Sequence, residues 1–168
     1  TKDTQGLLKK LKENALKSIE VVKDKVTNFN LYDEGNIKNI SYLEYLEDYL
    51  KPYFTAAVGN YKITMDAKKE FSRSNLNINK ISDLMNSHHN YLKKDLKITT
   101  PEIDNMIDIS FENGAIGSKI VGSGGGGSIV SLSTNSNTSN KIVSKLRSIG
   151  VKDAFIARKG SGPSIYYE

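Results

Sequence analysis

The feature that most constrains the fold of this chain is a run of glycines between two apolar segments. Seven of its thirteen glycines lie between positions 114 and 127, and residues 119–121 and 128–132 flank the densest part of the run. Both flanks are rich in β-branched residues, which are typical of strands. Glycine lets the backbone turn at positive φ and lets a ligand or a neighbouring loop approach the main chain closely. The sequence therefore predicts two strands joined by a glycine loop.

Three uses of such a loop are open on the sequence alone. Its successive N–H groups can form an anion-binding concavity, which would place a phosphate beside the loop. The run Ser-Gly-Gly-Gly-Gly-Ser is also the composition of a flexible linker, and a long hairpin loop needs no ligand at all. We favour the phosphate-proximal loop, because a linker would have polar flanks without strand character. It is not a Walker A loop, since no Gly-Lys-Ser/Thr follows, nor a dinucleotide fingerprint, since a strand follows it.

The candidate site consists of the residues that form this loop: Gly122, Ser123, Gly124, Gly125, Gly126, Gly127 and Ser128. The glycines would offer backbone N–H groups to a phosphate, whereas the hydroxyls of Ser123 and Ser128 either donate to the phosphate or close the turn. Lys119 is either a cation in a cleft or a structural surface residue, and we favour the structural role.

Other residues that could carry chemistry have a plainer explanation. His88 and His89 are adjacent rather than four residues apart, and the chain has no cysteine, so we expect no metal site. His88 falls on the apolar stripe of a predicted helix and is expected to be a core or interface residue. Asp104 and Asp108 share one helix face near its N-terminus, where an exposed acidic face is favourable.

Composition limits the class of protein. The chain has no cysteine, which excludes disulfides, and it has no tryptophan. No apolar run approaches the roughly 20 residues of a membrane helix and no signal-peptide pattern is present, so we expect a cytoplasmic protein without a membrane partner. The net charge of +5 comes from lysines interspersed with acids, which predicts a solvated helical surface rather than a nucleic-acid site.

Residues 1–113 are mainly helical in pattern. Apolar residues recur at spacings of three and four, which predicts helices over these segments: about 8–26, 41–50, 54–65, 81–92 and 100–113. Pro52 is expected to stop the second of these helices. Thr100-Pro101-Glu102 is typical of a helix start, with a hydroxyl cap, a proline and an acid in the first turn. Asn113-Gly114 is typical of a helix end.

The apolar period changes from residue 118 onwards. Two strands flank the glycine loop, a helix follows over about 137–149, and two more strands are predicted at 154–157 and 164–167, joined by a turn at 159–163. Residues 114–168 would then follow the order β-β-α-β-β. We therefore expect one α+β domain over residues 1–168, in which an antiparallel four-stranded sheet has helices packed on one face and extra helices precede it.

The glycine loop and its neighbours resemble motifs of the GHMP small-molecule kinases. The segment Lys119-Ile-Val-Gly-Ser-Gly-Gly-Gly-Gly-Ser128 is similar to their third motif, although Val121 and Ser128 replace its threonine and cysteine. Upstream, Leu84-Met-Asn-Ser-His88 resembles the Met-Asn-x-x-His of the galactokinase branch. Thr100-Pro-Glu-Ile-Asp104 and Gly114-Ala-Ile-Gly117 resemble the motifs that follow it in that branch.

The resemblance implies a ferredoxin-like C-terminal domain of a GHMP kinase, most like that of the galactokinases. Such a kinase uses ATP and Mg²⁺ to phosphorylate a small-molecule hydroxyl, which in galactokinases is the C1 hydroxyl of galactose. The family's N-terminal domain carries the ATP loop and the catalytic base, and its Gly-Leu-Gly-Ser-Ser string does not occur here. We therefore expect no catalytic residue in this chain, and no kinase turnover by the chain alone.

The same resemblance implies two partners, a sugar substrate and the N-terminal kinase domain of the same protein. An exposed interface for that domain would also allow self-association of this chain. Two alternatives remain open on the sequence. The enzyme could be another GHMP kinase, acting on a heptose phosphate or on mevalonate, or the chain could be a non-catalytic module that binds a ligand or partner on the same fold.

Overall fold

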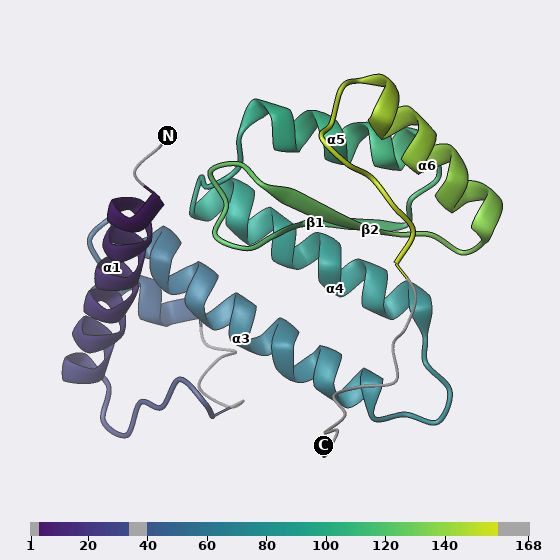
Figure 1. Cartoon of the computed structure of the whole chain (residues 1–168). Coiled ribbons are helices and arrows are strands. Elements are labelled where there is room, and N and C mark those ends of the chain that lie inside the picture. The colour runs from purple at the N-terminus through teal and green to yellow at the C-terminus, as the bar shows by residue number, and fades with distance from the viewer. Residues whose placement is uncertain (1–3, 34–39, 158–168) are drawn as a thin grey trace, which may run out of the picture.

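The computed structural model describes residues 4–33 and 40–157 of the chain (Figure 1). Its elements follow one another in this order: α1 (Thr4–Lys25), the 3-10 helix η1 (Ile40–Tyr45), α3 (Lys51–Phe71), α4 (Ile78–Asn90), the π-helical turn η2 (Tyr91–Asp95), α5 (Pro101–Glu112), β1 (Gly117–Val121), β2 (Ser128–Leu132) and α6 (Ser136–Ser148). Helices followed by a β-hairpin and a further helix confirm an α+β fold. Among the described helices, none combines the length and the apolar character that crossing a membrane requires.

Side-chain caps fix where three of the helices begin. Asn77, Thr100 and Asn135 precede α4, α5 and α6, and each accepts a hydrogen bond from a backbone N–H of the first turn. The cap at Thr100, with a proline after it, confirms the helix start that the sequence predicts. Pro52 lies in the first turn of α3 rather than just beyond a helix end, because its missing N–H is harmless there. The helix expected over 41–50 is the shorter η1.

Helices lie on both faces of the sheet. β1 and β2 are antiparallel, with Ile120 opposite Ile129. Ile120 packs against α5, whereas the backbone of α4 lies against Gly117. Because Cβ directions alternate along a strand, Ile120 and Gly117 point to opposite faces. Figure 1 shows the same arrangement, with α5 and α6 on one side of the strands and α4 on the other. The expectation of helices on a single face is therefore wrong.

The structure does not confirm a four-stranded sheet. Its described residues form two strands, and residues 154–157, which are predicted as a strand, have no strand partner among them. Ala154 is bound to α6 instead. Its carbonyl oxygen accepts a hydrogen bond from Nη2 of Arg147 at 2.6 Å, and its side chain packs with Ile142 and Leu146. The predicted turn at 159–163 and strand at 164–167 lie outside the described residues.

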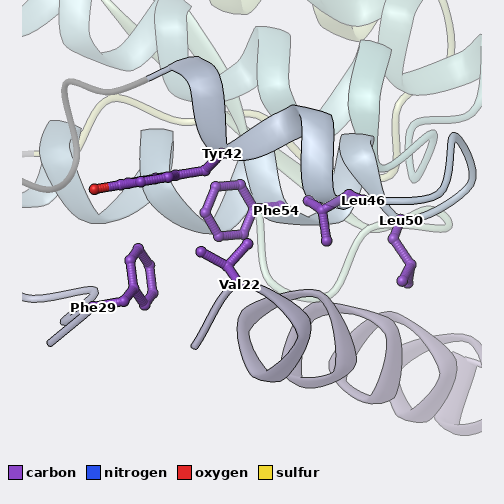
Figure 2. Packing of buried hydrophobic residues seen from close by; sticks show 6 residues of the cluster. All are labelled: Val22, Phe29, Tyr42, Leu46, Leu50 and Phe54. Carbon is purple, nitrogen blue, oxygen red and sulfur yellow. The ribbon is translucent and has the colours of Figure 1, made fainter. Parts of the chain in front are cut away.

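Buried side chains tie these layers together in three clusters within the described part of the chain. The first cluster joins α1, η1 and α3 through six residues: Val22, Phe29, Tyr42, Leu46, Leu50 and Phe54 (Figure 2). Within it, the ring of Phe29 meets the ring of Tyr42 edge-on at 5.4 Å between centroids. The second cluster lies between α5 and the sheet, and the third between α5 and α6. Together they hold the sheet against α5 and the N-terminal helix against α3.

A buried carboxylate fixes the connection between α3 and α4. Glu70 is 4% exposed, and its carboxylate accepts hydrogen bonds from the backbone N–H of Asn77 at 2.8 Å and from Arg73 at 3.1 Å. The bond from Asn77, followed by the interactions with Arg73, holds the pKa of Glu70 below its usual range, although burial acts in the opposite direction. The ionised carboxylate therefore stabilises the folded state.

We predict that Glu70→Gln lowers stability at neutral pH but not in acid. Because the pKa of Glu70 is lower in the folded state, the advantage of the parent chain over the variant should be complete above the ordinary pKa of 4.5. It should be lost as the pH falls through the lower pKa of the folded state. Urea denaturation at neutral pH and at values down to about pH 3 measures this difference. Glu112→Gln, at an exposed residue of α5, is the control and should show no such trend. A difference for Glu70 that grows on acidification would contradict the prediction.

Candidate phosphate-proximal loop

The loop between β1 and β2 has a backbone conformation that only glycine adopts readily. Five of its residues have positive φ: +87° at Gly122, +75° at Gly124, +70° at Gly125, +131° at Gly126 and +99° at Gly127. A residue with a side chain is strained at such angles, because its Cβ approaches the neighbouring carbonyl oxygen. The turn itself therefore requires the glycine run, with or without a ligand.

One side of the loop is docked on the segment that follows η2. The N–H of Gly125 donates a hydrogen bond to the carbonyl oxygen of Ile98 at 2.7 Å, and a Cβ on Gly124 would lie 2.7 Å from the same oxygen. Gly124 is buried, and Ile98 belongs to the second hydrophobic cluster. A flexible linker would make no such contacts, so the structure favours an ordered loop. The N–H of Gly125 is also already used.

The other side of the loop is open. A Cβ added to Gly122, Gly126 or Gly127 would meet no atom within 4 Å. Ser123 is half-buried and Ser128 is exposed, and neither hydroxyl is hydrogen-bonded to another residue of the described part of the chain. This side of the loop leaves room for a ligand or for another domain.

The side chain of Lys119 binds a backbone group of its own strand. Its Nζ donates a hydrogen bond to the carbonyl oxygen of Ile120 at 2.7 Å, and the side chain is half-buried. Burial lowers the pKa of the Lys119 ammonium. These contacts favour the structural role over that of a cation in a cleft.

Of the two histidines, His89 is the buried one. It is 6% exposed, whereas His88, which the sequence places in the apolar stripe, is half-buried. The pattern Met-Asn-x-x-His, counted from Met85, places its histidine at position 89. The spacing of the motif therefore indicated His89, the buried histidine. Burial lowers the pKa of both imidazoles. Within residues 4–33 and 40–157, no group of three histidines, cysteines or acids could hold a metal ion.

The two aspartates of α5 have different surroundings. Asp108 is exposed, as the sequence predicts. Asp104 is half-buried and forms an ion pair with Lys93 of η2, with 3.1 Å between Nζ and Oδ2. The expected acidic face is therefore wrong for Asp104. Its ion pair with Lys93 connects η2 to α5. These two elements flank the segment that carries Ile98.

Two residues that hold the loop and its strand are not identified by the sequence analysis. Asn86 of α4 binds the start of β1 through both ends of its side-chain amide, to Ser118 of the strand and to Ile116 just before it. The Met-Asn-x-x-His motif includes Asn86, so the sequence did indicate that this residue has a role. Ile98 acts through its backbone carbonyl oxygen, and a sequence carries no signal for such a contact.

Comparison with known proteins defines the class to which this fold and loop belong. The sequence profile of the family described as GHMP kinases C terminal matches residues 69–152, which is 84 of the 168 residues. The match runs from the end of α3 through the glycine loop to the segment after α6. The chain belongs to this family, which confirms the resemblance of its motifs.

Within the family, the chain is similar to galactokinases. A galactokinase from Dictyostelium discoideum is 39% identical over 59 residues, which is 35% of this chain and 12% of the relative. One from Bacillus subtilis (strain 168) is 39% identical over 57 residues, which is 33% of this chain and 15% of the relative. The crystal structure of Lactococcus lactis galactokinase complexed with galactose shares the fold, with a TM-score of 0.68 and 18% identity. That match covers 89% of this chain and 38% of the other, so the chain spans well under half of these proteins.

We predict that Gly124→Ala destabilises the chain more than Gly125→Ala. The two residues have nearly the same φ, so both variants carry a conformational strain of about 1–2 kcal/mol. Only the Cβ at position 124 meets the carbonyl oxygen of Ile98, and this overlap should add about 1–3 kcal/mol. Urea denaturation followed by circular dichroism measures both values. Equal losses of stability would show that the loop is not docked on Ile98.

Proposed function

We propose that this chain is the C-terminal domain of an ATP-dependent sugar kinase that phosphorylates galactose at its C1 hydroxyl. Family membership supports the kinase class, and the two galactokinase relatives support galactose as the acceptor. The observation that carries the proposal is an ordered glycine loop, anchored on one side and open on the other, at the position of the family's third motif.

The proposed role of the loop is to complete a phosphate site. Phosphoryl transfer requires in-line positioning and neutralisation of the triphosphate charge, with little covalent work by the protein. The backbone N–H groups of Gly122 and of residues 126–127, with the hydroxyls of Ser123 and Ser128, would bind phosphate oxygens. Because these glycines have no Cβ, the nucleotide could approach the backbone closely. The N–H of Gly125 would take no part, since it is bound within the chain.

In this proposal, ATP and Mg²⁺ are bound mainly by an N-terminal kinase domain, which also supplies the catalytic base. A bound Mg²⁺ ion would neutralise charge on the phosphates. The described residues offer no group of three acids or histidines for a metal ion, so we assign none of them to Mg²⁺. No residue of this chain is assigned a catalytic role.

The proposed partner is the N-terminal domain of the same kinase. Val121 and Val130 are 47% and 43% exposed beside the loop. They share one face of the hairpin, because Val130 is opposite Lys119 and Val121 lies two residues further along the strand. Exposed apolar surface next to a functional loop is typical of a contact surface. We propose that it contacts the N-terminal domain and that, in the chain alone, it favours self-association.

We predict that an intact kinase containing this chain converts ATP and galactose into ADP and a galactose phosphate in equal amounts. The chain alone should show no turnover, because it supplies neither the base nor most of the nucleotide site. A coupled assay of ADP release, with galactose, mevalonate and a heptose phosphate as separate acceptors, measures both. If only mevalonate or only the heptose phosphate is phosphorylated, that compound would replace galactose as the proposed acceptor. Saturable ligand binding by the chain, with no ADP release by the intact protein, would support the non-catalytic module instead.

A further inference from the structure

Strand β1 has a second hydrogen-bonded neighbour besides β2, and this neighbour is a side chain. Nδ2 of Asn86 donates to the carbonyl oxygen of Ile116 at 3.1 Å, and Oδ1 accepts from the N–H of Ser118 at 3.0 Å. The two backbone groups lie on either side of Gly117. A residue on a parallel neighbouring strand bonds in the same way, to the residue before and the residue after its partner. Asn86 therefore takes the place of a strand at the outer edge of β1.

A close approach of α4 to β1 makes this contact possible. A Cβ on Gly117 would lie 3.0 Å from the Cα and Cβ atoms of Ser82 and 3.2 Å from its carbonyl oxygen. The φ of Gly117 is not positive, so this glycine is required by the contact and not by a turn. With a side chain at position 117, α4 would move away from the strand and the short side chain of Asn86 would no longer reach it.

The contact with Ile116 and Ser118 depends on the hydrogen-bonding groups of the Asn86 carboxamide and not on the volume of the side chain. Asn86→Asp keeps an acceptor for the N–H of Ser118 but places a carboxylate beside the carbonyl oxygen of Ile116. Asn86→Leu has a similar size and leaves both backbone groups without a partner at a partly buried edge. An unpaired polar group of this kind is unfavourable, so the strand would shift to find another partner or water.

One continuous segment holds both the strand and the loop. Asn86 binds β1, which runs directly into Gly122, and Ile98 of the same segment accepts the N–H of Gly125. We infer that Asn86 is a positioning residue of the glycine loop: its carboxamide sets β1 along α4, so that the loop meets the carbonyl oxygen of Ile98. The position that Asn86 gives to the loop does not depend on the proposed function, whereas the effect of Asn86 on phosphoryl transfer does.

Amide hydrogen exchange of the chain, measured by NMR, tests the positioning directly. Asn86→Leu and Asn86→Asp are compared with the same substitutions at Asn90, an exposed residue at the end of α4. At a temperature where circular dichroism shows each variant to be folded, both substitutions at Asn86 should accelerate exchange of the N–H of Gly125 about tenfold. Exchange at Leu146 in α6 should not change, and neither substitution at Asn90 should affect the loop.

Two outcomes of this measurement would overturn the inference. Unchanged exchange at Gly125 in a folded variant would show that Asn86 does not position the loop. Equal acceleration at Gly125 and Leu146 would show that Asn86 contributes only to overall stability. If Asn86→Leu does not fold, Asn86→Asp gives the same readout, because it keeps the volume and the acceptor for Ser118.

Kinetics of the intact kinase provide a second readout. Asn86→Asp should lower kcat/KM for ATP about tenfold and leave KM for the sugar unchanged, because the loop lies on the phosphate side of the proposed site. Asn90→Asp should change neither value. A rise of about tenfold in the KM for the sugar as well would contradict a role through the loop. If the unsubstituted protein transfers no phosphate, the proposed function fails, whereas the exchange measurement still decides the role of Asn86.

Discussion

The carbonyl oxygen of Ile98 holds the glycine loop, and much of the surrounding structure keeps that oxygen in place. It accepts the N–H of Gly125 at 2.7 Å and leaves no room for a Cβ at Gly124. Ile98 is itself buried in the cluster against α5, and its own N–H donates to the carbonyl oxygen of Leu92 in η2 at 3.1 Å. Because the contact is between backbone groups, the arrangement of η2 and α5 sets the position of the loop.

A loop that is fixed on one side and open on the other suits phosphoryl transfer. This chemistry depends on positioned donors, and donors that are already in place need no reorganisation when charge develops. The five positive φ angles are adopted without strain because all five residues are glycines, and both strands and Ile98 hold the loop in this one conformation. Lys119 and Asn86 close the outer edge of β1 with side chains, so the strand that leads into the loop has bonded neighbours on both sides.

The sequence predicted those features whose causes are local. A hydroxyl, a proline and an acid at 100–102 marked a helix start, and the glycine run marked a turn with positive φ. It did not predict the contact with Ile98, because a backbone carbonyl can belong to any residue. The strand predicted at 154–157 was a short continuous apolar run, but Arg147 binds the carbonyl oxygen of Ala154 instead. The buried histidine was misplaced by one residue, since the helical period alone does not separate His88 from His89.

The response of the loop amides to nucleotide is the most direct test of a phosphate-proximal loop. NMR spectra of the intact kinase with isotope-labelled glycine would be recorded during titration with ADP and Mg²⁺. The signals of Gly122, Gly126 and Gly127 should shift to saturation, whereas Gly150, which also has a positive φ but follows α6, should not respond. Unchanged loop signals in a protein saturated with nucleotide would contradict the assignment of this loop to the phosphates.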